Sequence, residues 1–134
     1  MENHPVSEHG ENLNHDAYAP GQHLLIDFWG AQQPRTVEQV ETLLRGAAAA
    51  CGATVLDIRL HGFGDGGGIT GVAILAESHI SVHTWPERDY IALDIFLCGA
   101  RDATPALEML KMQLEPAYSV ISKHLRGADR TKRG

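Results

Sequence analysis

The run from Leu75 to Glu87 concentrates groups that can donate, accept or attack. Its reactive members are Glu77, Ser78, His79, His83 and Glu87. Core strands rarely carry so many polar groups, because each needs a hydrogen-bonding partner once it is buried. One interpretation is a strand with one solvent-facing side and with Ile80, Val82 and Thr84 packed inward. The other is that the chain performs chemistry on itself here.

Two simpler kinds of site fit this run poorly. His79 and His83 could bind a metal from one face of a helix, but the residues around them favour a strand and no third ligand is suitably spaced. A Ser–His–Cys set could serve a hydrolase, since an activated nucleophile needs an adjacent base. Ser78, however, lacks the Gly-x-Ser-x-Gly elbow, and no buried carboxylate is obviously placed to orient His83. We therefore expect no metal site and do not favour a hydrolase.

Composition indicates an acidic, globular protein. The chain has 134 residues, enough for one modest core, with 43% hydrophobic and 21% charged residues. Its net charge of −6 argues against a nucleic-acid partner and suits a cationic substrate. Cys51 and Cys98 lie far apart, which indicates free thiols in a reducing compartment. Because no run is long and apolar enough for a membrane span and the start resembles no signal peptide, we expect a cytoplasmic protein.

The elements that must position these groups follow from periodicity. Strands are predicted at 23–29, 53–61, 69–76, within the 75–87 run, at 90–98 and at 118–124. Two helices are predicted, one from a capping Thr36 to Gly52 and one from a capping Thr104 to Glu115. Helices covering one face of a mainly antiparallel sheet make an α+β two-layer sandwich. We expect a single domain at 21–127, a disordered extension at 1–20 and a flexible tail at 128–134.

Two local patterns add detail. In the 53–61 strand, Leu56, Ile58 and Leu60 are expected to share one face. The glycine-rich loop at 62–68 leads into a strand and lacks the Lys-Ser/Thr of a P-loop, so we do not expect phosphate binding. A flap or a close backbone approach to a ligand is the preferred interpretation, with Phe63 as an available stacking ring.

Residues 76–87 and 90–99 together resemble the prokaryotic S-adenosylmethionine decarboxylase proenzyme. The resemblance rests on the string Glu-Ser-His-x-x-x-His-Thr-Trp-Pro-Glu at 77–87 and on Asp-x-Phe-x-Cys-Gly at 94–99. It extends from Gly-Gln-His-Leu at 21–24, through Gly-Val-Ala at 71–73, to Arg-Gly at 126–127. Nearly everything beyond the first 20 residues is therefore covered.

The resemblance implies self-cleavage between Glu77 and Ser78. The Ser78 hydroxyl would attack the Glu77 carbonyl and convert the amide to an ester. Removal of the Ser78 α-proton would expel the Glu77 carboxylate and leave a dehydroalanine, which hydrolyses to a covalently bound pyruvoyl group. The processing base matches His83, and a neutral imidazole with an unperturbed pKa of about 6.5 suits that task. The assisting hydroxyl falls at Thr70, where many relatives have serine.

The resemblance also implies how the mature enzyme would act. The pyruvoyl carbonyl would form a Schiff base with the α-amine of S-adenosylmethionine and act as an electron sink while carbon dioxide leaves. Cys98 matches the family's proton donor, and a thiol with a pKa of about 8.5 is mostly protonated at neutral pH. Phe63 and Trp85 are candidates to contact the adenine, and Glu87 to hold the ribose hydroxyls.

The resemblance therefore implies a pyruvoyl-dependent carboxy-lyase that makes decarboxylated S-adenosylmethionine, the aminopropyl donor for spermidine. Two alternatives stay open. The same self-cleaving machinery could act on arginine or ornithine, or the chain could be a non-catalytic relative that remains uncleaved. The resemblance further implies a homodimer of processed units with sites near the subunit interface. Neither a nucleic acid nor a membrane is expected as a partner.

Overall fold

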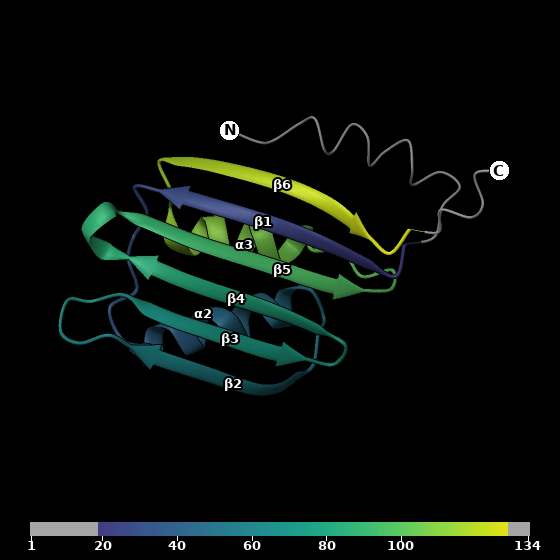
Figure 1. Ribbon diagram of the computed structural model, residues 1–134, viewed down its shortest axis with the longest axis horizontal. Helices are drawn as coiled ribbons and strands as arrows, with labels where there is room; N and C mark the ends of the chain where they lie inside the picture. The colour runs from purple at the N-terminus through teal and green to yellow at the C-terminus, as the bar shows by residue number, and fades with distance from the viewer. Residues whose placement is uncertain (1–18, 129–134) are drawn as a thin grey trace.

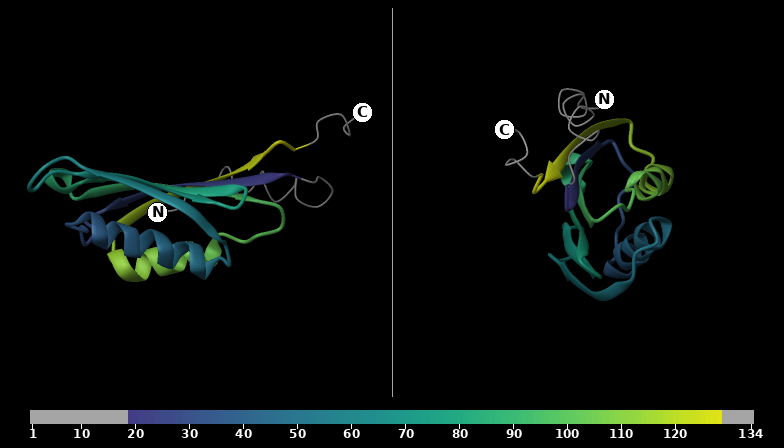
Figure 2. Two further views of the ribbon diagram at one scale, coloured as in Figure 1. Left: turned by 90° about the horizontal axis from the view of Figure 1, so that it is seen from below. Right: turned by 90° about the vertical axis from the view of Figure 1, so that its right-hand side faces the viewer.

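Six strands form one antiparallel sheet, and two α-helices cover one of its faces (Figures 1 and 2). This computed structural model describes residues 19–128. The elements are β1 (Gly21–Trp29), α2 (Val37–Ala50), β2 (Val55–Gly62), β3 (Ile69–Leu75), β4 (Ser78–Trp85), the 3-10 turn η1 (Pro86–Arg88), β5 (Tyr90–Cys98), α3 (Thr104–Leu114) and β6 (Tyr118–Arg126). The predicted α+β two-layer fold is confirmed. Apart from residues 19, 20 and 128, the predicted extension and tail lie outside the described residues.

The strand order is β2-β3-β4-β5-β1-β6, so the first strand lies between the fifth and the last. β3, β4 and β5 are neighbours in sequence and pair as successive antiparallel hairpins. β1 pairs with both β5 and β6, which places His23 opposite Phe96 on one side and opposite His124 on the other. His79 of β4 also lies opposite Phe96. The first strand, β1, therefore places its side chains between those of β5 and those of the last strand, β6.

Alternation along the strands separates a core face from an open face. The predicted inward residues Ile80, Val82 and Thr84 of β4 are buried. Every second residue of β5 from Ile91 to Leu97 is also buried beneath the helices. Within residues 19–128 no element covers the other face (Figure 2). None of the described helices is long and apolar enough to span a bilayer.

The two helices begin differently. Thr36 caps α2 as predicted, because its hydroxyl accepts from the Gln39 N–H at 3.1 Å while the Gln39 side chain accepts from the Thr36 N–H. The predicted cap of α3 is wrong. Thr104 is the first helical residue, and the Asp102 carboxylate accepts from its N–H at 3.0 Å. A carboxylate two residues upstream has taken the place of the Thr104 hydroxyl.

The predicted inward position of Leu56 is also wrong. A register irregularity lies between Val55 and Asp57 on the edge strand β2, where one extra residue interrupts the pairing with β3. Leu56 is that residue and is 63% exposed. Ile58 and Leu60 do pack against the core, as predicted. The bulge therefore changes which side chains face inward at only one end of the strand.

Candidate active site

The predicted cleavage point lies in the tight turn that joins β3 to β4. Leu75 pairs with Ser78, so only Ala76 and Glu77 form the turn. Glu77 has a φ of 62°, in the left-handed region. That conformation costs a residue with a side chain about 1–2 kcal/mol. The residue that would supply the attacked carbonyl is thus held in a strained backbone conformation.

Cys98, the last residue of β5, contacts both partners of the predicted cleavage. Its thiol donates to the carbonyl oxygen of Glu77. Its backbone N–H donates to the hydroxyl oxygen of Ser78 at 3.2 Å. A donor on the carbonyl oxygen stabilises the negative charge that develops there during nucleophilic attack. The fold therefore brings together Glu77 in the turn, Ser78 at the start of β4 and Cys98 at the end of β5.

A second group of predicted residues meets at the other end of β4. Thr70 and His83 form a cross-strand pair, and Oγ1 of Thr70 lies 3.1 Å from Nδ1 of His83. A cavity of about 250 Å³ opens beside them. Its lining contains all the remaining predicted residues, namely Phe63, Thr70, His83, Trp85 and Glu87.

The glycine-rich loop closes one side of this cavity. A close backbone approach occurs at Gly68, where a Cβ would lie 2.2 Å from the carbonyl oxygen of Thr84, whereas the predicted approach was to a ligand. The neighbour is thus strand β4, which lets the loop place Phe63 at the cavity. Phe63 itself is exposed and contacts His61 edge-on, with ring centroids 4.5 Å apart.

The two groups do not meet within one chain. Ser78 and His83 are five residues apart on one extended strand, which is roughly 16 Å at about 3.3 Å per residue. The predicted processing base therefore cannot reach the predicted nucleophile of its own chain.

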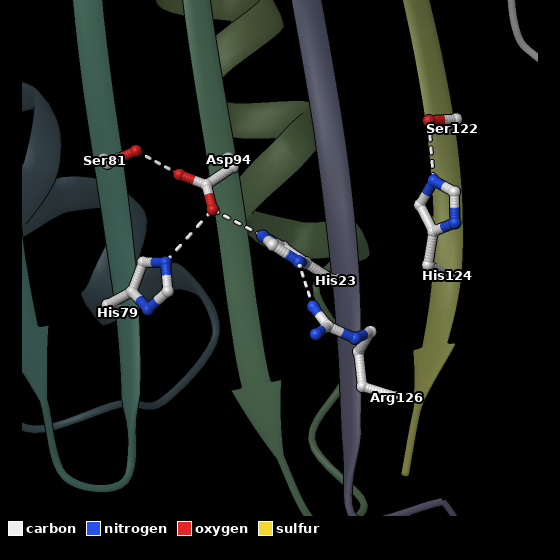
Figure 3. Close-up of polar contacts among 7 residues, drawn as sticks. All are labelled: His23, His79, Ser81, Asp94, Ser122, His124 and Arg126. Atoms are coloured by element: carbon white, nitrogen blue, oxygen red, sulfur yellow. Dashed lines mark hydrogen bonds and ion pairs between the residues drawn. The ribbon is translucent and has the colours of Figure 1, made fainter. Parts of the chain in front are cut away.

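A third cluster on the open face was not foreseen (Figure 3). Asp94 accepts hydrogen bonds from the Ser81 hydroxyl, from Nε2 of His23 at 2.5 Å and from Nε2 of His79 at 3.0 Å. Burial raises the pKa of Asp94, but these hydrogen bonds, with Ser81 first, outweigh burial and leave the pKa below its usual value. Sequence spacing showed no third possible metal ligand beside His79 and His83, and the fold supplies two next to His79, namely His23 and Asp94, from other strands.

Stacked aromatic rings on the open face hold Trp85, one of the residues that line the cavity. The ring of Trp85 stacks on Tyr90, and Tyr90 stacks on Trp29, with centroids 5.2 and 4.3 Å apart. The Tyr90 hydroxyl donates to Asp27 at 2.5 Å. Burial, together with that carboxylate, raises the pKa of Tyr90 to about 12, so the phenol remains a donor. These stacked rings fix Trp85, the residue predicted to contact adenine.

Comparison with known proteins identifies the family. The sequence profile described as S-adenosylmethionine decarboxylase matches residues 22–127. This chain belongs to that family. The S-adenosylmethionine decarboxylase proenzyme of Methanococcus aeolicus is 48% identical over 114 residues, which are 81% of this chain and 94% of that one. The proenzyme of Thermomicrobium roseum is 36% identical over 108 residues, or 80% and 93% of the two chains.

A solved structure agrees with this assignment. The crystal structure of the adenosylmethionine decarboxylase from Aquifex aeolicus superposes with a TM-score of 0.75 at 34% sequence identity, covering 83% of this chain and 93% of that one. The resemblance to the S-adenosylmethionine decarboxylase proenzyme is thereby confirmed, and so is the carboxy-lyase class. The comparisons support decarboxylation of S-adenosylmethionine and give no support to arginine, to ornithine or to a non-catalytic role.

Proposed function

We propose that this chain cleaves itself between Glu77 and Ser78 and then decarboxylates S-adenosylmethionine with the pyruvoyl group that Ser78 becomes. One observation carries the proposal. The Glu77 carbonyl, the Ser78 hydroxyl and the Cys98 thiol meet at the β3–β4 turn, in a chain whose relatives are named proenzymes.

Ser78 fits the demands of the first step. Its hydroxyl oxygen is held by the Cys98 N–H, beside the carbonyl carbon that it must attack. The Cys98 thiol, bound to the Glu77 oxygen, stabilises the charge that forms as the carbonyl bond opens. The left-handed conformation of Glu77 raises the free energy of the intact turn. Cleavage releases that strain, so the turn favours the reaction.

After cleavage Cys98 changes its role. Once the carbonyl of Glu77 has left the site as a carboxylate, the thiol is free to donate its proton to the substrate carbon that has lost carbon dioxide. The pyruvoyl group supplies an electrophilic carbonyl that takes up the substrate amine and accepts the electrons released with carbon dioxide. The nucleoside would lie in the cavity beside His83 of a second copy of the chain, with Phe63 and Trp85 against the adenine and Glu87 on the ribose hydroxyls.

The separation of the two residue groups requires a second copy of the chain. Because His83 lies roughly 16 Å along the strand from Ser78, we propose that the Thr70–His83 pair of one copy serves Ser78 of the other. A two-fold axis through the open face would bring opposite ends of the two sheets together. That face carries several large exposed apolar side chains: Leu25, Trp29, Ile74 and Trp85. Covering such a surface favours association.

The proposed role of Cys98 also requires a reducing environment. A proton-donating Cys98 must stay reduced, and both Cys51 and Cys98 are free. We therefore place the enzyme in a reducing compartment, the cytoplasm. The product would serve as the aminopropyl donor for spermidine. Residues 21–127 form the domain that carries this activity, since they contain all predicted site residues.

Intact-mass measurement together with turnover tests the proposal. The purified protein should separate into chains 1–77 and 78–134, the second without a free amino terminus. It should release carbon dioxide from S-adenosylmethionine and not from arginine or ornithine. The Ser78→Ala variant should remain one chain. An uncleaved wild-type chain, or product from an amino acid alone, would contradict the proposal.

A further inference from the structure

A continuous series of hydrogen bonds crosses the open face and ends on His79, the residue after Ser78 (Figure 3). Arg126 lies at its outer end, with Nη1 3.0 Å from Nδ1 of His23. Nε2 of His23 and Nε2 of His79 both face Asp94. The order of groups is therefore guanidinium, imidazole, carboxylate and imidazole, drawn from strands β6, β1, β5 and β4.

Donor and acceptor chemistry fixes the hydrogens of this series. A guanidinium has only donors, so Nδ1 of His23 must accept from Arg126 and its hydrogen must be on Nε2. An ionised carboxylate only accepts, so Nε2 of His79 also carries a hydrogen. The lone pair of a neutral His79 is therefore on Nδ1.

The same chemistry opposes a metal at His23, His79 and Asp94. To bind a cation through Nε2, His23 would have to move its hydrogen to Nδ1, where it would face the donors of Arg126. Metal-binding histidines normally donate that hydrogen to an acceptor. The positive charge of Arg126 also repels a cation. The cluster is suited to orienting imidazoles and unsuited to holding an ion.

The His79 ring is held in one orientation, yet the proposed function gives it no role. Its ring lies parallel to that of Phe96, 5.8 Å away at an interplanar angle of 12°, and Asp94 holds its Nε2. No group within residues 19–128 hydrogen-bonds its Nδ1, and the side chain is 39% exposed. In Figure 3 that nitrogen points away from Asp94 and toward the end of β4 where Ser78 lies. A free lone pair, fixed in direction, is thus presented to solvent beside the reacting residue.

Covalent structure brings this lone pair near the reacting carbon. The keto carbon of the pyruvoyl group is the former Cα of Ser78, and consecutive Cα atoms are about 3.8 Å apart. The carbon belongs to the main chain, so the alternation of side chains between faces does not separate it from His79. It lies within one side-chain length of the imidazole.

We propose that His79, oriented by Asp94, is the base that deprotonates the α-ammonium group of the substrate and then returns that proton. This inference rests on the proposed function. Nδ1 takes a proton from the ammonium, leaving a neutral amine and an imidazolium. The amine nitrogen bonds to the keto carbon as the carbonyl π bond breaks. The imidazolium then gives its proton to the departing oxygen. A second hydrogen comes from the nitrogen, water leaves, and His79 is neutral again.

His79→Gln is the direct test, because the glutamine amide can still donate to Asp94 but offers no basic nitrogen. Substrate attachment to chain 78–134 is measured at single turnover, by borohydride reduction of the carbon–nitrogen double bond and intact mass. We expect attachment at pH 7 to slow by about 10²–10⁴-fold. The defect should shrink about tenfold per pH unit as the fraction of free amine rises, which a structural defect would not do.

His124→Gln is the matched control. His124 is on the same open face, on β6, and contacts Ser122 at 3.3 Å. Its loss should leave attachment unchanged. A wild-type rate in the His79→Gln variant would overturn the proposal. Loss of cleavage in that variant would overturn it too, because His79 would then be needed to make the pyruvoyl group and not for the reaction of that group with the substrate. An uncleaved wild-type chain would instead be the failure of the proposed function.

A second measurement does not depend on cleavage. In the uncleaved Ser78→Ala chain, imidazole ¹⁵N chemical shifts report which nitrogen carries the hydrogen. We expect the Nε2–H form for His79 and His23, and a shift of His79 toward the Nδ1–H form when Asp94→Asn is added. An Nδ1–H form of His79 in the Ser78→Ala chain would overturn the assignment. So would a cleaved Asp94→Asn chain that attaches substrate at the wild-type rate.

Discussion

Cys98 contacts both residues of the Glu77–Ser78 peptide bond. Its N–H orients the Ser78 oxygen and its thiol polarises the Glu77 carbonyl. Both contacts exist only because β5 ends at this residue, beside the start of β4. In the proposed enzyme the thiol is a hydrogen-bond donor before cleavage and a proton donor after it. The two duties ask for different properties, so substitution should separate them.

Cys98→Ala should slow cleavage modestly and nearly abolish decarboxylation. Cleavage loses one hydrogen bond to the oxyanion, while decarboxylation loses its acid, worth about 10²–10⁴-fold. Intact mass follows the first step and carbon dioxide release the second. Cys51→Ala is the control. The Cys51 thiol donates to the Ala48 carbonyl in α2, and burial raises its pKa. Equal loss of both steps in Cys98→Ala would contradict the division of roles.

Asp94 should make stability depend on pH in the acid range. Its pKa is lower in the folded protein than the ordinary value of 3.8. A depressed pKa means that its stabilising contribution is complete above about pH 4 and is lost as the pH falls through the folded-state value. Asp94→Asn should therefore lower the free energy of unfolding at pH 7, by about 1–3 kcal/mol. Urea unfolding of both proteins should show this difference narrowing below pH 4.

At the scale of elements, the β3–β4 turn stores strain at Glu77, and Glu77→Gly should remove it. Glycine accepts a φ of 62° without a side-chain penalty. We expect a more stable precursor, by about 1 kcal/mol, and about fivefold slower cleavage followed by intact mass. Ala76→Gly is the control, since Ala76 lies in the same turn and has no positive φ. Faster cleavage of Glu77→Gly would show that strain does not assist the reaction.

The elements themselves were largely readable from the sequence, because alternation and helix caps are local signals. The two errors at this scale have local causes as well. Leu56 is displaced by a bulge that only the pairing with β3 defines. Thr104 lost its capping role to Asp102, a competing acceptor two residues earlier. The first outcome depends on which residue of β2 is left out of the strand pairing, and the second on which side chain accepts the hydrogen bond. A pattern of residue types determines neither.

At the scale of the whole molecule, the order of strands decided what the sequence could not predict. Motif resemblance predicts roles for Glu77, Ser78, His83 and Cys98 without any geometry. The cluster at Asp94 escaped notice because β1 lies between β5 and β6, which brings His23 to a residue 71 positions away. Likewise, the distance between Ser78 and His83 follows only once both residues are known to lie on the same strand, β4. That distance is the strongest reason to expect a second subunit.

Completion of the site by two copies predicts that two inactive variants restore one another. Ser78→Ala keeps His83 but has no nucleophile, and His83→Ala keeps Ser78 but has no base. Each should remain uncleaved alone. When both are co-expressed, the Ser78→Ala copy should supply its imidazole to Ser78 of the His83→Ala copy. Intact mass should then show cleavage of the His83→Ala chain only. If the base acted within its own chain, neither would be cleaved in the mixture. A doubly substituted chain mixed with His83→Ala is the control, because it can form the same pairs but contributes no imidazole.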